Sequence, residues 1–192
     1  MNPLLPLSAV VLAAGHSTRM GRDKALLELD GMALWSRQRE ILARAGAAEI
    51  FLSARPGQEW SRRIAGFTAV LHDSWPNSGP IAGLTAGLER ATQAHLAVLA
   101  IDLPRMTTAW FDRLHGDCAP GMGAVGRRGD FFEPLAAIYP RELMPLAWQA
   151  LAKGEHSLQR LLATAVTQGL MRVRQIDETD APLFENWNEP SP

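Results

Sequence analysis

The chain has 192 residues, of which 47% are hydrophobic and 20% charged, and this ordinary globular composition excludes a largely disordered protein. The net charge is −1 with acidic and basic residues interspersed, so no broad basic surface for nucleic acid or an anionic membrane is indicated. Cys118 is the only cysteine and cannot form an internal disulfide, which is compatible with a reducing compartment.

Residues 1–15, MNPLLPLSAVVLAAG, contain an apolar run similar to the core of a signal peptide. We reject that interpretation because no Lys or Arg precedes the run and because Pro3 and Pro6 interrupt its start. Cleavage after LAAG would also remove residues that look functional. No stretch approaches the roughly 18 apolar residues that a membrane span needs. We therefore expect a cytoplasmic protein.

Short apolar runs alternate with segments of helical periodicity, which is typical of a mostly parallel sheet covered by helices on both faces. A crossover helix is predicted within residues 31–46, where Leu34, Ile41 and Leu42 lie near one face and Gly46 is a plausible stop. The first half of the chain should supply four strands, at residues 9–13, 49–53, 68–71 and 96–101.

A change of pattern follows in the second half of the chain. A helix is predicted over 107–114, with Thr107 or Thr108 as its N-cap. Residues 123–140 then form two extended segments around a turn at 127–130. The remaining elements are helices at 141–153 and 157–167 and a strand at 171–176. No repeat or linker divides the sequence, so we expect one domain over 1–192.

The stretch VVLAAGHSTRMGRDKALL, residues 10–27, indicates an anion site after the first strand. In open α/β sheets phosphate collects at such loops, and Gly15 and Gly21 allow a close backbone approach while Arg19 and Lys24 add positive charge. The spacing fits neither the P-loop nor the dinucleotide-binding fingerprint. The alternative is an ordinary glycine-rich turn with solvated basic residues.

Asp102 ends the apolar run HLAVLAID, so its carboxylate should project from the carboxyl edge of the sheet toward the same crevice. A hard oxygen ligand beside a triphosphate suits Mg²⁺. A turn cap before Pro104 is the alternative. Asp73, after the third strand, could equally be a turn former.

Near the C-terminus Asn186 and Asn188 are two residues apart, so in an extended chain both amides face one side. Paired amides can bind a polar heterocycle or a phosphate, although a surface turn would contain the same residues. Glu133 lies in the extended run FFEPLAAIYP, where an outward-facing carboxylate is the alternative to a functional one.

Five segments, LAAGHSTRMGRDK, GPIAG, IDLP, EPLAAIY and NWNEP, closely resemble motifs of the molybdenum cofactor guanylyltransferase family and occur in the family's order. The resemblance implies a three-layer α/β/α architecture of the Rossmann-like nucleotide-diphospho-sugar transferase type, in one nucleotidyltransferase domain. It also implies transfer of GMP from GTP to molybdenum-molybdopterin with release of pyrophosphate. Residues of about 8–105 would bind nucleotide, and about 106–188 would bind the acceptor.

The same resemblance implies roles for single residues. Lys24, Arg19 and Asp102 would be catalytic, and Asp102 would bind Mg²⁺. Acceptor binding would involve Glu133, Asn186 and Asn188. Nucleotide contacts are expected from Leu12, Ala13, Ala14, Gly15, Lys24, Ser53, Asp73, Gly79, Pro80 and Asp102. The implied protein partners are a molybdenum insertase and molybdoenzyme chaperones, and the chain itself is expected to be a monomer or weak oligomer.

One residue departs from the family pattern. Guanylyl members usually show Leu-Ala-Gly-Gly, whereas this chain has Ala14, as in cytidylyl- and uridylyltransferase relatives. CTP in place of GTP therefore remains an alternative substrate, as does another phosphorylated acceptor. A nucleotide-binding regulator without turnover is an alternative of a different class.

Overall fold

The computed structural model describes residues 6–15, 23–72, 75 and 78–187. Within these residues the strands form a large seven-stranded sheet and a two-stranded hairpin of β2 (Glu28–Leu29) and β3 (Met32–Ala33). The spatial order of the large sheet is β5 (Ala69–Leu71), β4 (Glu49–Ser53), β1 (Leu7–Leu12), β6 (His95–Ala100), β8 (Phe131–Pro140), β7 (Gly123–Arg128) and β9 (Met171–Gln175).

All strands of the large sheet except β8 run in the same direction. β1 is parallel to β4 and β6, β4 to β5, and β7 to β9, whereas β8 is antiparallel to both of its neighbours. β8 returns directly from β7 through a tight turn in which Gly129 has a φ of +58°. The mostly parallel sheet and the hairpin at 123–140 are both confirmed.

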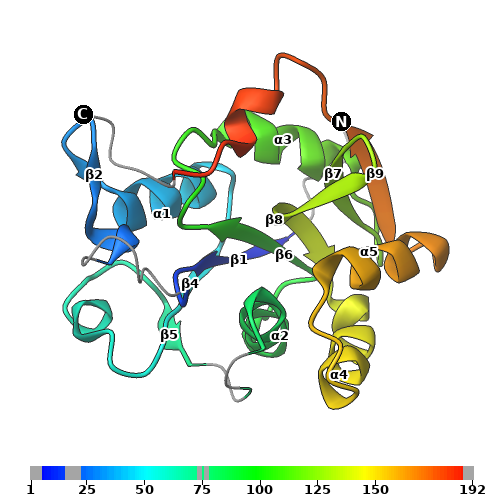
Figure 1. Cartoon of the computed structure of the whole chain (residues 1–192), viewed down its shortest axis with the longest axis horizontal. Coiled ribbons are helices and arrows are strands. Elements are labelled where there is room, and N and C mark those ends of the chain that lie inside the picture. The colour runs from blue at the N-terminus through cyan, green and yellow to red at the C-terminus, as the bar shows by residue number, and fades with distance from the viewer. Residues whose placement is uncertain (1–5, 16–22, 73–74, 76–77, 188–192) are drawn as a thin grey trace.

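Helices cover both faces of the sheet (Figure 1), which confirms the predicted three-layer architecture. On one face lie α1 (Leu34–Arg44) and α3 (Thr108–Asp117). On the other lie α2 (Pro80–Arg90), α4 (Met144–Ala152) and α5 (Leu158–Thr167). The described residues also contain short 3-10 turns, namely η1 (Lys24–Leu26), η2 (Glu59–Arg62), η3 (Arg141–Leu143) and η4 (Ala181–Phe184).

The burial of the central strand β1 accounts for its nearly continuous apolar sequence. All six of its residues are buried, because both faces of the sheet are covered. Ala9 and Val11 pack on the side of α1 and α3, while Val10 and Leu12 pack on the side of α2. A strand buried in this way is a rigid support for the loop that follows it.

The element ends differ from the sequence predictions by a few residues. The strand predicted at 9–13 is observed at 7–12, and that predicted at 96–101 is observed at 95–100. The helix predicted at 107–114 continues to Asp117, with Thr107 at its N-cap position but without a side-chain capping bond. The β2–β3 hairpin was not predicted, because two-residue strands are too short to show alternation. None of the helices in the described part of the chain could span a bilayer.

Close packing of α2 on the sheet accounts for two glycines of the motif GPIAGLTAGL. A Cβ atom at Gly87 would lie 2.9 Å from Leu96 Cδ2, and one at Gly83 would lie 2.7 Å from Ser53 Oγ and 2.8 Å from Leu12 Cδ2. Gly79, by contrast, has open space around it but a φ of +69° at the N-cap of α2. Gly83 and Gly87 therefore allow the helix to lie close to the sheet, and Gly79 adopts the backbone conformation at which the helix begins.

We expect Gly83→Ala to destabilise the fold, because the added methyl group must displace Ser53 and Leu12. Overpacking of this kind costs about 1–3 kcal/mol, against which alanine's higher helix propensity offsets about 1 kcal/mol. Urea unfolding followed by circular dichroism measures the change. Gly116→Ala in α3 is the matched control, because a Cβ atom added at Gly116 would meet no atom within 4 Å. This variant should raise the free energy of unfolding. Equal gains in both variants would contradict the close approach of α2.

Candidate active site

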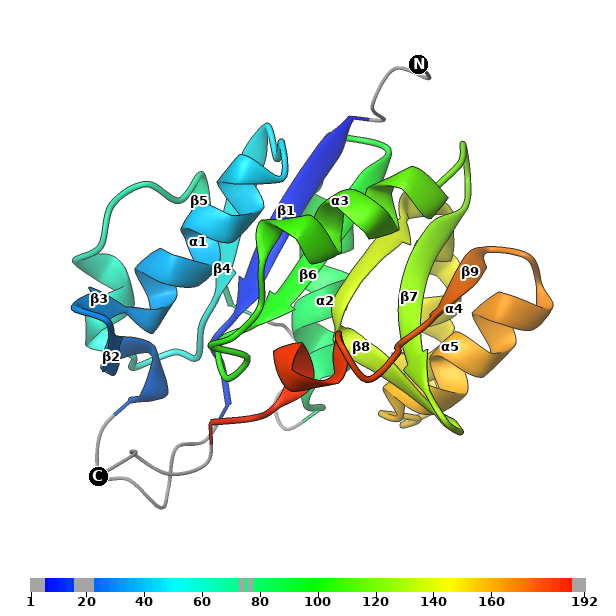
Figure 2. The same ribbon diagram turned by 90° about the horizontal axis from the view of Figure 1, so that it is seen from above.

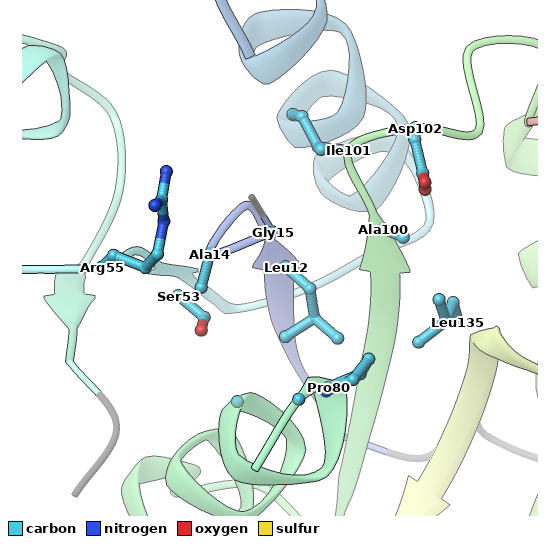
Figure 3. A pocket seen from close by; sticks show the side chains of 12 residues that line it. Leu12, Ala14, Gly15, Ser53, Arg55, Pro80, Ala100, Ile101, Asp102 and Leu135 are labelled. Carbon is cyan, nitrogen blue, oxygen red and sulfur yellow. The ribbon is translucent and has the colours of Figure 1, made fainter. Parts of the chain in front are cut away.

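A pocket of about 410 Å³ opens at the edge of the sheet where the parallel strands end (Figure 3). Leu12, Ser53 and Ala100, the last residues of β1, β4 and β6, line it from the sheet. The N-terminal part of α2, beginning with Pro80, and Leu135 of β8 line it from the sides. Small-molecule sites typically have volumes of about 300–1,000 Å³, so this pocket has the size of a ligand site.

The lining is mostly apolar, and its polar side chains are Ser53, Arg55 and Asp102. Figure 3 shows Arg55 and Asp102 on opposite sides of the opening. Ser53 is buried, whereas Arg55 and Asp102 are half-buried. An apolar surface with opposite charges at its margins can bind a flat ring inside and a charged group outside.

The predicted phosphate loop begins at this pocket. Ala14 and Gly15, the second and third residues after β1, both line it. Arg19 lies outside the described residues. The next described residue after Gly15 is Asp23, whose side chain caps η1 by accepting a hydrogen bond from the Ala25 N–H at 3.1 Å. Lys24, the first residue of η1, is half-buried and is not among the residues that line the pocket.

Asp102 lies in the turn after β6, and α1 fixes this turn. The buried side chain of Gln38 donates from Nε2 to the carbonyl oxygens of Ala100, at 3.2 Å, and Leu103, at 2.8 Å. These two carbonyls lie on either side of Asp102 in the chain. Their hydrogen bonds hold the backbone in place while the Asp102 carboxylate remains directed at the pocket (Figure 3).

The C-terminal segment, residues 177–187, crosses the same edge of the sheet (Figure 2). The Trp187 N–H donates to the carbonyl oxygen of Asp102 at 3.0 Å. Asn186 is exposed and immediately precedes this bond, so the structure brings it into the neighbourhood of Asp102. Further contacts that hold the segment include the ion pairs Arg105–Glu185 at 2.6 Å and Arg113–Asp180 at 2.5 Å, and the edge-on packing of Trp110 and Phe184, whose ring centroids are 4.9 Å apart. Asn188 and Asp73 lie outside the described residues.

Asp102 is chemically suited to a divalent cation. Mg²⁺ at nucleotide sites usually takes one or two carboxylates and completes its shell with phosphate oxygens and water. Among the described residues no group of three or more His, Cys, Asp and Glu could enclose a metal alone.

Glu133 does not line the pocket. It is half-buried on β8, two residues before the pocket residue Leu135, and its carboxylate lies 3.9 Å from the Arg128 guanidinium. Burial raises the pKa of Glu133, and the positive charge of Arg128 lowers that pKa by less. A carboxylate retained where its charged form is disfavoured is a candidate for function.

Sequence reasoning missed some of the lining residues. Arg55 follows β4 just as Asp102 follows β6, so the rule that ligands gather beyond strand ends could have found it. Leu135 carries no such signal, because apolar residues in a strand look the same whether they face a core or a ligand.

The fold and the pocket define an α/β nucleotidyltransferase domain. Residues 9–171 match the model of the MobA-like NTP transferase domain, and the chain belongs to this family. A probable molybdenum cofactor guanylyltransferase of Opitutus terrae is 43% identical over 187 residues, which cover 96% of this chain and 91% of the relative. The molybdenum cofactor guanylyltransferase of Pseudomonas putida strain GB-1 is 33% identical over 168 residues, 86% of each chain.

A solved structure agrees with these relatives at the level of the fold. Molybdopterin-guanine dinucleotide biosynthesis protein A of Archaeoglobus fulgidus superimposes with a TM-score of 0.74 at 21% identity, covering 95% of this chain and 93% of the other. The family resemblance and the fold class expected from the motifs are therefore confirmed.

We expect Glu133→Gln to raise the melting temperature at neutral pH, because it removes a charge that burial disfavours. A carboxyl group whose pKa is raised on folding costs stability as the pH rises through its ordinary value near 4.5 and into the raised range. The advantage of the variant should thus shrink as the pH falls through that range and be lost below the ordinary value near 4.5. Melting curves of both proteins across this pH series measure it. A variant less stable than the parent at neutral pH would contradict the assignment.

Proposed function

We propose that this protein transfers GMP from GTP to the phosphate of molybdopterin carrying molybdenum, releasing pyrophosphate and forming molybdopterin guanine dinucleotide. The observation that carries the proposal is the strand-edge pocket between Gly15 and Asp102, in a chain whose curated relatives are named for guanylyl transfer. The size and apolar lining of the pocket support a nucleobase as occupant.

In this proposal the nucleotide occupies the pocket with its triphosphate toward the loop after β1. Gly15 of the loop and Gly79 at the N-cap of α2 both line the pocket, and glycine-rich loops and helix N-termini are common phosphate sites, which supports this orientation. The residues assigned to the nucleotide are Leu12, Ala13, Ala14, Gly15, Lys24, Ser53, Asp73, Gly79, Pro80 and Asp102. Most of them line the pocket, which supports the assignment.

The reaction needs two polyanions close together. Attack of the acceptor phosphate on the α-phosphorus, in line with the departing pyrophosphate, requires positioning and charge neutralisation but no covalent enzyme intermediate. Two like charges 4 Å apart repel by about 4 kcal/mol at an effective dielectric of about 20. Lys24 and Arg19 would offset this repulsion. Mg²⁺ held by Asp102 would neutralise charge between the α-phosphate and pyrophosphate.

The acceptor is assigned to the side of the pocket that Leu135 of β8 lines and that the C-terminal segment approaches through its hydrogen bond to Asp102. Glu133 lies on β8, and Asn186 lies beside the bond from Trp187 to Asp102, which supports an acceptor near the metal. Asn188 would complete the paired amides. A cytoplasmic location, an insertase as donor, chaperones as recipients and a monomeric or weakly oligomeric state belong to the same proposal.

Ala14 favours one second candidate, cytidylyl transfer to molybdopterin. Its methyl group lines the pocket, where guanylyl members usually have glycine. One methyl group shifts selectivity by only about 1–3 kcal/mol, so it does not by itself exclude guanine.

We expect GTP to be turned over at least about tenfold faster than CTP, ATP or UTP, which corresponds to about 1.4 kcal/mol of discrimination. Pyrophosphate release with molybdenum-molybdopterin as acceptor and each nucleotide in turn measures this preference. A preference for CTP would replace guanylyl by cytidylyl transfer. Absence of pyrophosphate release with all four nucleotides, alongside GTP binding, would favour a nucleotide-binding regulator.

We expect Asp102→Ala and Lys24→Ala each to lower turnover of GTP by about 100-fold or more, since Lys24 would offset the negative charge of the transition state and Asp102 would hold the Mg²⁺ that also offsets it. Both side chains are half-buried, so the melting temperature of each variant should stay near that of the parent protein. The controls are Asp112→Ala and Lys153→Ala, which alter exposed side chains of the same types. Turnover above about a tenth of the parent rate in either site variant would overturn the role given to that residue.

A further inference from the structure

Gln58 is a buried polar side chain that lies outside the pocket yet connects to both ends of its loop. It is 7% exposed and precedes η2 in the segment after β4. Its Nε2 donates to the Ala13 carbonyl at 3.1 Å and to Asp23 Oδ2 at 2.5 Å. Its Oε1 accepts from the Arg55 N–H at 2.6 Å. One amide group thus makes three hydrogen bonds to three separate parts of the chain.

Both carboxylate oxygens of Asp23 accept hydrogen bonds from other parts of the protein in this arrangement. Oδ2 accepts from Gln58 and from Trp60 Nε1, the latter at 2.8 Å, while Oδ1 accepts from the Ala25 N–H at 3.1 Å. Hydrogen bonds to a charged acceptor are stronger than neutral ones. The carboxylate next to Lys24 is therefore an anchor for the chain and not a ligand directed at the pocket.

Two of the hydrogen-bond partners of Gln58 flank the predicted phosphate loop in the sequence. Ala13 immediately precedes residues 14–22, and Asp23 immediately follows them, so Gln58 joins the two ends of the predicted phosphate loop. Gln58 is separated from these partners by 45 and 35 residues, so the link is tertiary and does not arise from the loop itself. Arg55, the third partner, lines the pocket.

We propose that Gln58 is a positioning residue for triphosphate binding, which fixes the distance between the two ends of the loop through Ala13 and Asp23. This inference rests on the proposed function, because it takes residues 14–22 to hold the triphosphate. Fixing the loop ends before the ligand arrives reduces the ordering cost of binding.

The chemistry of the site demands an amide of this length. Glutamate could accept from the Arg55 N–H but would place an oxygen against the Ala13 carbonyl and Asp23 Oδ2, where only a donor fits. Methionine keeps the volume of glutamine and removes all three hydrogen bonds. The two variants therefore separate loss of the bonds from active repulsion.

The test compares binding of GTP and GMP, each with Mg²⁺ and without acceptor, by isothermal titration calorimetry. The parent should bind GTP more tightly than GMP, and Gln58→Met should lose GTP affinity by about tenfold or more while GMP affinity stays within about twofold. Gln58→Glu should lose at least as much. A uniform loss for both nucleotides, or an unchanged preference for GTP, would overturn the inference.

Gln159→Met is the matched control, because Gln159 also makes two hydrogen bonds to backbone, with the N–H and carbonyl of Phe132, but far from the loop in the sequence. It should lower stability without changing the preference for GTP over GMP; a loss of preference there would also overturn the inference. If Gln58→Met does not fold, Trp60→Phe keeps a ring and removes one donor to Asp23, and should show a smaller loss in the same direction. A parent without preference for GTP would contradict the proposed function itself.

Discussion

The parallel pairing of β1 with β4 and β6 is the constraint on which the site depends. Leu12 pairs with Ser53 on one side and with Ala100 on the other, so three strands end at the same height in the sheet. All three residues line the pocket. Because the strands are buried on both faces, this edge cannot shift without disturbing the core. The loops that follow the strands therefore leave from a rigid base.

Buried side-chain amides then hold the loops that the sheet cannot hold. Gln38 binds the backbone on either side of Asp102, and Gln58 binds the Ala13 carbonyl before the predicted phosphate loop and the Asp23 carboxylate after it. An amide can donate twice and also accept, which suits irregular backbone that has no strand or helix partner. A buried polar group without such bonds would be costly, so each glutamine favours one conformation of its loop.

The sequence was informative where a pattern follows from a periodic constraint. Apolar runs predicted the parallel strands, and the glycine-rich loop and Asp102 were found because strand ends share an edge. Gln58 and Gln38 could not be assigned in this way, since the acceptors of their amide nitrogens are 35 to 65 residues away in the chain. Nothing in the local sequence distinguishes an amide that bonds distant backbone from one that faces solvent. Arg55 is intermediate, because the strand-end rule could have found it.

Three carboxylates near the edge of the sheet show how environment separates residues of one chemical type. Asp23 accepts three hydrogen bonds within the protein and is a fixed anchor. Asp102 has its backbone held while its side chain lines the pocket, so it remains available to a cation. Glu133 is half-buried with Arg128 as a distant partner, and burial raises its pKa. The hydrogen-bond partners of each group, more than its residue type, decide whether it holds the chain or faces a ligand.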